Sequence, residues 1–177
     1  MSITALKVVT SATVACSFIL AGNAITQSFM GVPALLVDFP APGSPTHAER
    51  ARLLGRQWPI FWEVGNRFFR PLSTLGIALY GSAAWAARQQ GRGNWKLLAV
   101  AACCNILTAA HSAINMQPIN ERITALGTAP APGDNKAEAT GDEKAEEYAR
   151  RWGRLNLLRV VMPLIAGTLA MSQVLEN

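Results

Sequence analysis

The chain has 177 residues, of which 50% are hydrophobic and only 15% are charged. A formal net charge of +5 would suit nucleic acid, but several arginines lie inside or beside apolar runs, so we expect no nucleic-acid partner. The three cysteines all fall in apolar stretches and two are adjacent, a pattern without disulfide or metal-ligand spacing. We therefore expect one domain, residues 1–177, embedded in a lipid bilayer.

The first apolar segment predicts a membrane helix over residues about 3–31. A signal peptide is the alternative, because Lys7 precedes an apolar run over residues 8–20 and small residues at 21–24. We expect the segment to be retained as a helix. The proline-rich stretch that follows is incompatible with a helix interior and predicts a long loop that extends to about Pro59.

Two further helices are predicted over residues about 60–88 and 95–117. The earlier of the two keeps its charged residues in its first half, and its second half is apolar. The later one has about the 20 residues that a hydrocarbon core of about 30 Å requires at 1.5 Å per residue. We expect Pro118 to end it.

Residues about 127–147 are rich in Ala, Pro, Gly, Asp, Glu and Lys, which predicts a flexible linker. A fourth helix is predicted over residues about 149–175. Its early arginines, Arg150, Arg151 and Arg154, are expected at the membrane interface. The predicted fold is thus an all-α integral membrane four-helix bundle with long loops after the first and third helices.

Each predicted helix carries polar residues at helical spacing, and alternating helix directions would bring all four polar stripes to one end of the bundle. Polar groups in membrane helices are costly unless they face the bundle interior or a hydrated cavity. The pattern therefore predicts a polar pocket. The stripe residues, in chain order, are Asn23, Gln27, Glu63, Asn66, Arg67, Arg70, Thr74, Thr108, His111, Asn115, Trp152, Asn156 and Arg159.

Several of these residues have a purely structural alternative. Arginines near helix ends often reach head groups, and Asn, Ser and Thr often join helices by hydrogen bonds. Glu63 is expected to pair with Arg67, four residues later, and His47 is expected to be an exposed loop residue. His111 is either a hydrogen-bonded core residue or a proton acceptor near neutral pH, and the sequence leaves both open.

Two motifs are the most specific features of the sequence: Pro118-x-Asn120 after the third helix, and Trp152-x-x-Leu155-Asn156-x-x-Arg159 at the start of the fourth. With Asn23, Ser28, residues 32–36, Gln57-Trp58 and Gly65, they resemble the DUF1772 family, which includes the fungal anthrone oxygenases. The resemblance covers nearly the whole chain. It implies oxidation of the methylene carbon of an anthrone by O2 to an anthraquinone, in aromatic polyketide biosynthesis, without an organic cofactor.

The predicted pocket suits this reaction. Loss of a methylene proton gives an enolate that passes an electron to O2, which requires a base and groups that stabilise an oxyanion. We hypothesise that His111 is the base, that Arg70 or Arg159 stabilises the enolate, and that Asn156 acts with them. The expected substrate-binding residues are Asn23, Gln27, Asn66, Arg67, Asn115, Asn120 and Trp152.

No dinucleotide fingerprint occurs in a βαβ context, so flavin and nicotinamide are not expected. We expect no metal and O2 as co-substrate; the alternative is iron or copper bound by His111, Glu63 and an asparagine. The alternative function is a non-catalytic carrier or assembly subunit.

The expected partners are a hydrophobic aromatic small molecule and a lipid bilayer, in an endomembrane such as the endoplasmic reticulum. Small residues at positions 83, 84, 101 and 102 permit close helix packing and leave the oligomeric state open.

Overall fold

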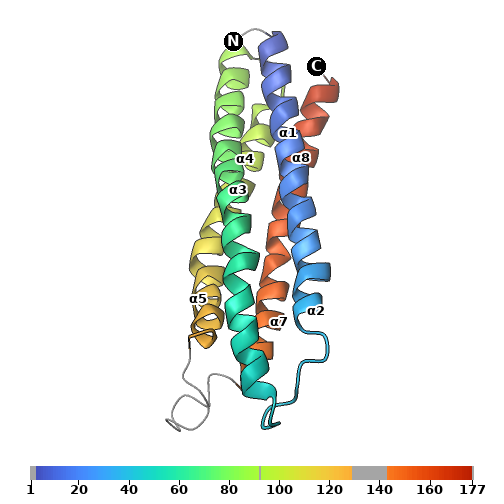
Figure 1. Ribbon diagram of the computed structural model, residues 1–177. Coiled ribbons are helices and arrows are strands. Elements are labelled where there is room, and N and C mark those ends of the chain that lie inside the picture. Colours follow the sequence, from blue (N-terminus) through green and yellow to red (C-terminus); the bar gives the residue numbers. More distant parts are fainter. Residues whose placement is uncertain (1–2, 92, 129–142, 177) are drawn as a thin grey trace.

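Four long helical rods run side by side in the computed structural model, which describes residues 3–91, 93–128 and 143–176 (Figure 1). The rods are formed, in chain order, by α1 (Ile3–Thr26) with the π-helical turn η1 (Gln27–Gly31) and α2 (Val32–Leu35); by α3 (His47–Gln90); by α4 (Trp95–His111) with the π-helical turn η2 (Ser112–Met116) and α5 (Gln117–Leu126); and by α7 (Ala145–Asn156) with α8 (Leu158–Glu176). The described residues contain no β-strand. The predicted all-α four-helix bundle is confirmed.

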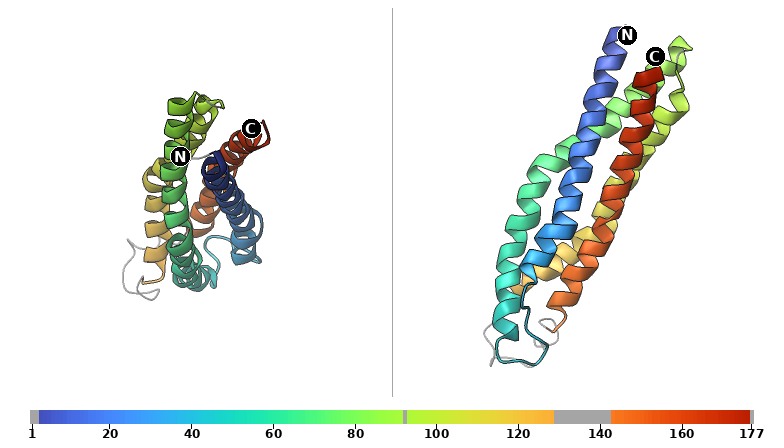
Figure 2. Two further views of the ribbon diagram at one scale, coloured as in Figure 1. Left: turned by 90° about the horizontal axis from the view of Figure 1, so that it is seen from above. Right: turned by 90° about the vertical axis from the view of Figure 1, so that its right-hand side faces the viewer.

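The rods alternate in direction, which places both termini and the α3–α4 turn at one end of the bundle and the α2–α3 loop at the other (Figures 1 and 2). α1 packs along α8, and α3 packs along α4. Gly91 ends α3 with a φ of 59°, a left-handed conformation that suits glycine, and donates its N–H to carbonyls of the last turn. The side chain of Asn94 caps α4 by accepting from the Lys96 N–H at 3.2 Å.

Prolines end fewer helices than the sequence predicts. The third rod does not end at Pro118, because this residue follows η2 and lies in the first turn of α5, where a missing N–H is tolerated. Pro33 occupies the same kind of position after η1. In both rods a wide π-helical turn therefore precedes the proline and lets the rod continue.

α3 begins at His47, well before the predicted start near residue 60, and contains Pro59 in its interior. Ala51, Leu54 and Trp58 follow helical spacing and are at most 1% exposed, so tertiary packing stabilises this early part of the helix. That packing outweighs the backbone hydrogen bond that Pro59 cannot make.

The loop between the first two rods covers only residues 36–46, so the predicted long loop up to Pro59 is wrong. His47 is 4% exposed, which corrects its predicted exposure. Its Nδ1 lies 2.7 Å from the Pro40 carbonyl oxygen, which can only accept, so the ring donates. The predicted linker over residues 127–147 lies mostly outside the described residues, and α7 begins at Ala145, before the predicted start of the fourth helix.

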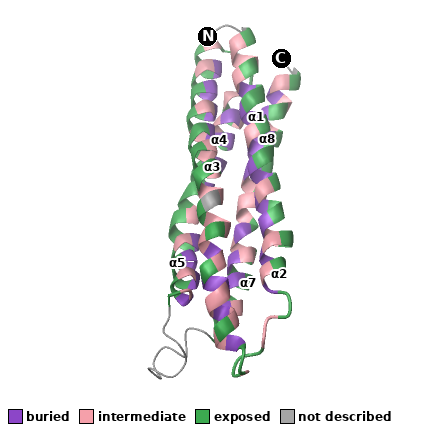
Figure 3. Cartoon of the chain, in the orientation of Figure 1, coloured by how far each residue is buried: buried purple, intermediate pink, exposed green. Residues whose placement is uncertain are grey.

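Three stretches of the described chain are long and apolar enough to cross a membrane: Thr4–Leu35, Trp95–Leu126 and Ala145–Leu175. In the last two, only 28% of the most apolar window is buried, so most of this apolar surface faces outward, as lipid contact requires (Figure 3). α3 is not among the three, although it runs beside them along the bundle. Of the four predicted apolar spans, three are confirmed by length and composition.

Two hydrophobic clusters occupy opposite ends of the bundle. The alanine cluster comprises Val14, Tyr80, Ala83, Ala84, Ala87, Leu98, Ala101, Ala102, Cys104, Ala166 and Ala170. The aromatic cluster comprises Val32, Leu36, Ala51, Leu54, Trp58, Met116, Ile119, Ile123, Leu126, Ala145, Ala149 and Trp152. The small residues at 83, 84, 101 and 102 therefore pack helices within one chain.

Candidate active site

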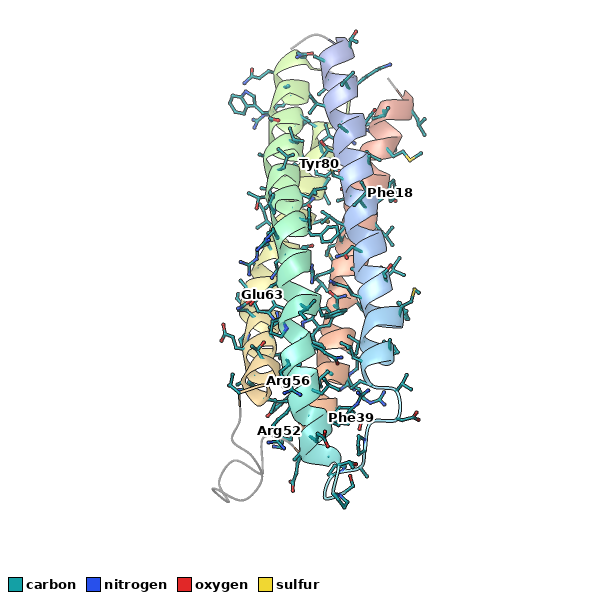
Figure 4. All side chains as sticks on the ribbon, viewed as in Figure 1. Phe18, Phe39, Arg52, Arg56, Glu63 and Tyr80 are labelled. Carbon is teal, nitrogen blue, oxygen red and sulfur yellow. The ribbon has the colours of Figure 1, made fainter. Side chains whose placement is uncertain are left out.

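A cavity of about 330 Å³ lies between the two clusters. On α3 it is lined by residues between 66 and 74, which lie between Glu63 and Tyr80 in Figure 4. Its polar lining consists of Asn66, Arg70, Ser73, Thr74, Thr108, Ser112, Gln117, Asn120 and Arg159. All four rods contribute, since Leu20 of α1 completes the wall. The pocket is thus in the middle of the bundle and not at its end as predicted, because α3, α5 and α7 extend past it.

The cavity lies where the uncharged part of the bundle ends. Four stretches contain no Asp, Glu, Lys or Arg: residues 8–37, 71–87, 97–120 and 160–175. Arg70, Glu121 and Arg159 directly adjoin three of these stretches, and Arg70 and Arg159 line the cavity. Because charged side chains in the hydrocarbon core are costly, this level is where the bilayer would meet the polar phase.

Arg159 is held by a hydrogen-bonded network that reaches the first rod. Its Nη1 donates to Asn156 Oδ1 at 3.1 Å. The Asn156 side chain is fully buried, and its Nδ2 donates to the Ala24 carbonyl at 3.0 Å and to Ser28 Oγ at 2.9 Å. Asn156 does not line the cavity, so it positions Arg159.

Ser28 lies on the other side of this network, in an open groove of about 730 Å³ between the first rod and α7. Phe29 and Val32 form part of its apolar wall, and Arg150 and Arg154 form part of its polar wall. The network thus separates an inner cavity from an outer groove.

Arg70 is exposed and donates to Gln117 Oε1 at 3.5 Å. Gln117 in turn donates to Glu121 Oε1 at 3.0 Å. The amide of Gln117 thus bridges Arg70 and the Glu121 carboxylate, which do not form a direct ion pair among the described residues. The expected ion pair between Glu63 and Arg67 is not formed among the described residues, where both side chains are exposed.

Asn120 is 5% exposed, and its Oδ1 accepts from the Trp58 indole N–H at 3.0 Å. An indole nitrogen can only donate, so this bond fixes the amide orientation and leaves Asn120 Nδ2 available to the cavity. Ser73 is a further polar group there, and its buried Oγ has no hydrogen-bond partner in the described part of the chain.

His111 does not line the cavity. Its Nε2 lies 3.0 Å from the Leu155 carbonyl oxygen, which can only accept, so Nε2 carries a proton. Its Nδ1 then accepts from Asn115 Nδ2 at 3.1 Å. Leu155 lies just before the break between α7 and α8 at Leu157, so His111 joins the third rod to this break.

The π-helical turn η2 explains why Asn115 is exposed although it was predicted to line the pocket. A regular helix places residues three and four apart on one face. The wider turn adds a residue and rotates the following face by roughly 100°. The cavity is accordingly lined by Met116 and Gln117 in place of Asn115.

The other predicted residues lie elsewhere. Asn23 is half-buried on α1 and Arg67 is exposed on α3, and neither lines the cavity. Gln27 and Trp152 are at least nine-tenths buried, and Trp152 belongs to the aromatic cluster. Gln27 Oε1 and Trp152 Nε1 have no hydrogen-bond partner among the described residues.

Of the predicted site residues, Asn66, Arg70, Asn120 and Arg159 line the cavity together. The predicted polar stripes also contained Thr74 and Thr108, which line the cavity, but they omitted Ser73, Ser112 and Gln117. The spacing from Asn66 and Arg70 does point to Ser73. Helical spacing in the sequence did not point to Gln117, because the π-helical turn η2 changes which residues share a face of the helix.

Within the described residues, no three His, Cys, Asp or Glu side chains gather closely enough to hold a metal ion. Glu63 is exposed, and His111 is bonded to Leu155 and Asn115. Reaction without a metal stays a prediction.

Comparison with known proteins identifies the family. The family model described as anthrone oxygenase matches residues 58–169, well over half of the chain. Anthrone oxygenase ptaC of Pestalotiopsis fici (strain W106-1 / CGMCC3.15140) is 28% identical over 119 residues, which cover 67% of this chain and 83% of that protein. No solved structure matches. The matched region contains nearly all of the cavity, and the chain belongs to the anthrone oxygenase family.

Proposed function

We propose that this protein is a multi-pass membrane enzyme of the endoplasmic reticulum or a similar endomembrane that oxidises an anthrone to an anthraquinone with O2 in aromatic polyketide biosynthesis. The observation that carries the proposal is the arginine-bearing cavity at the edge of the uncharged part of the bundle, in a member of the anthrone oxygenase family. An apolar tricycle with oxygen substituents partitions to such a boundary.

The walls of the cavity suit such a ligand. Its volume of about 330 Å³ is at the lower end of the range for small-molecule sites. Leu20, Phe69, Met116 and Pro163 supply apolar surface for fused rings, and the arginine and amide groups supply donors for oxygen atoms. The substrate would lie with its rings toward the alanine cluster and its oxygens toward Arg159.

The proposed chemistry balances without an organic cofactor. Loss of one methylene proton gives the enolate, which transfers one electron to O2. The resulting carbon radical and superoxide combine and take up a proton to give a carbon-bound hydroperoxide. Loss of water from this group, with the second methylene hydrogen, gives the quinone carbonyl. The overall reaction is anthrone plus O2 to anthraquinone plus water.

Arg159 and Arg70 are the proposed stabilisers of the enolate oxygen, because fixed positive charge acts most strongly where negative charge develops. Asn156 keeps the Arg159 guanidinium in place. His111 could serve as the base only if its bonds to Leu155 and Asn115 rearranged, since the ring does not line the cavity.

The test is oxygen uptake by purified protein given an emodin-type anthrone, with quinone formation followed by absorbance. We expect oxidation faster than the spontaneous background, and a loss of about 100-fold in kcat for Arg159→Gln, as for removal of other oxyanion-stabilising donors. Arg56→Gln is the matched control, because this exposed arginine of α3 lies in the part that packs on α5. A wild-type rate equal to the background would favour a carrier or assembly role.

Metal analysis of the same active sample tests the cofactor. We expect full activity without stoichiometric iron or copper. Activity that follows metal content would support the alternative.

A further inference from the structure

The cavity contains positive charge that no carboxylate of the described residues balances. Arg70 on α3 and Arg159 on α8 both line it, and neither pairs with a carboxylate among the described residues. Their acceptors are neutral amide oxygens of Gln117 and Asn156. Unpaired charge between membrane helices is costly, so a bound anion would stabilise this arrangement.

Two further side chains of the cavity have hydrogen-bond donors that could bind an anion. Asn120 has Nδ2 available because Oδ1 accepts from Trp58, and Ser73 has a buried hydroxyl without a partner in the described chain. The hydroxyls of Thr108 and Ser112 instead donate to carbonyls one turn earlier and offer only lone pairs. These lone pairs would accept from neutral hydroxyl groups on the same ligand.

The described lining residues include no histidine, aspartate or glutamate that would take a proton. On α4, His111 is bonded to Leu155 and Asn115; on α5, Glu121 is bonded to Gln117. α1 contributes Leu20 to the wall, and α8 contributes Arg159 and Pro163. Among the described residues, the cavity can therefore stabilise the anion of an acidic ligand by positive charge, but it has no general base to accept the proton.

We propose that the cavity binds a hydroxylated polycyclic aromatic as its oxyanion, ionised by Arg159 and Arg70, with the O–H proton released to water. This inference rests on the proposed function for the class of ligand. Opposite charge within about 4–6 Å lowers the pKa of an acid by about 1–3 units, enough to change the ionised fraction of a phenol near neutral pH. For an anthrone, loss of the O–H proton of its enol tautomer gives the enolate that O2 oxidises, so the arginines would set the concentration of the reactive species.

The test uses 1,8-dihydroxyanthraquinone as a probe, because its phenolate absorbs at longer wavelength than the phenol. The full-length protein in detergent micelles is titrated with pH in the presence of the probe, and protein-free micelles give the reference midpoint. We expect the bound probe to ionise about 1–3 pH units below that reference. Absence of binding, or an unshifted midpoint, would overturn the proposal even before any variant is made.

Substitutions then show which arginine causes the shift in the ionisation midpoint of the probe. Arg159→Gln should remove most of the shift, Arg159→Lys should retain most of it, and the control Arg56→Gln should match the wild type. An equal shift in Arg159→Gln and wild type would also overturn the assignment. If the probe ionises as expected but anthrone oxidation is not accelerated, the anion site stands and the oxygenase proposal fails. If oxidation is accelerated without a shift in the midpoint, the oxygenase proposal stands and the anion site fails.

Discussion

The two ends of the bundle are packed in different ways. The alanine cluster brings helices close: a side chain at Gly167 of α8 would approach Ser17 of α1 to 3.2 Å, and Tyr80 reaches across to Ser17 at 2.9 Å. The aromatic cluster instead fills its space with large rings, such as Trp58 and Trp152, whose centroids lie 5.4 Å apart.

This difference accounts for the position of the cavity. Small residues let helix axes approach, and large side chains keep them apart. Between the two kinds of packing a space is left unfilled, and it is lined by polar side chains together with a few apolar ones such as Phe69. Every residue of the alanine cluster lies in one of the four uncharged stretches, whereas eight of the twelve residues of the aromatic cluster lie outside them. The cavity is thus bounded by a core built wholly from uncharged stretches and a core built mostly from the charged parts of the chain.

The largest effect is expected from Gly55→Ala in α3. A methyl group there would lie 2.7 Å from the Leu126 carbonyl carbon and 2.8 Å from Gly127 Cα. The backbone of α3 could therefore not pack this closely against the end of α5. We expect little or no monodisperse protein by size-exclusion chromatography in detergent. Gly81→Ala in the same helix is the control, because nothing lies within 4 Å of its added carbon. Equal yields of the two variants would contradict the close contact.

Trp58→Ala removes a ring that is 0% exposed from the aromatic cluster. We expect the free energy of unfolding to fall by about 3–5 kcal/mol, because the void left by the ring adds to the loss of buried apolar surface. The hydrogen bond to Asn120 is also lost. Thermal unfolding in detergent measures the fall in stability. Trp85→Ala, at a ring that is 65% exposed, should change the midpoint little. A similar midpoint for both would show that the aromatic cluster does not stabilise the fold.

At the other end, Ala101→Leu tests whether the alanine cluster depends on small side chains. Ala101 is 0% exposed, so overpacking should cost about 1–3 kcal/mol, measured in the same unfolding assay. Ala110→Leu is matched on the same helix at an exposed position. A stabilised Ala101→Leu protein would mean that the helices are not in close contact there.

The smallest effect is expected for Ser28→Ala, which removes one acceptor from Asn156 without touching the cavity. Loss of one hydrogen bond, about 1 kcal/mol, corresponds to roughly a fivefold fall in kcat if Asn156 then holds Arg159 less firmly. KM should change less than kcat. Ser82→Ala, which removes an exposed hydroxyl on α3, is the control. A raised KM with unchanged kcat would indicate a binding role in place of positioning.

Helix content, helix order and the alternation of directions could be predicted because apolar runs and their polar stripes follow helical spacing. Asn66, Arg70 and Arg159 could be predicted as pocket residues for the same reason, and Asn120 could be predicted from the Pro118-x-Asn120 motif. The role of Asn156 as a positioning residue required its contacts with Ala24 and Ser28, which lie far away in the sequence.

Local rules failed where tertiary packing or a wide turn overrode them. The loop was predicted to extend to about Pro59, but buried side chains extend α3 back to His47. Asn115 was predicted to face the pocket, but η2 rotates it outward and brings Gln117 in. A π-helical turn leaves no clear sign in composition, so its effect on the helix face was invisible to spacing alone.

An experimental structure with bound 1,8-dihydroxyanthraquinone tests the central claim most directly, namely that the cavity between the two clusters is the active site. We predict rings against Leu20 and Pro163, on the side of the alanine cluster, and a ligand oxygen about 3 Å from the Arg159 guanidinium. A quinone seated in the outer groove beside Phe29 and Arg154, with Arg159 bound only to Asn156, would contradict it.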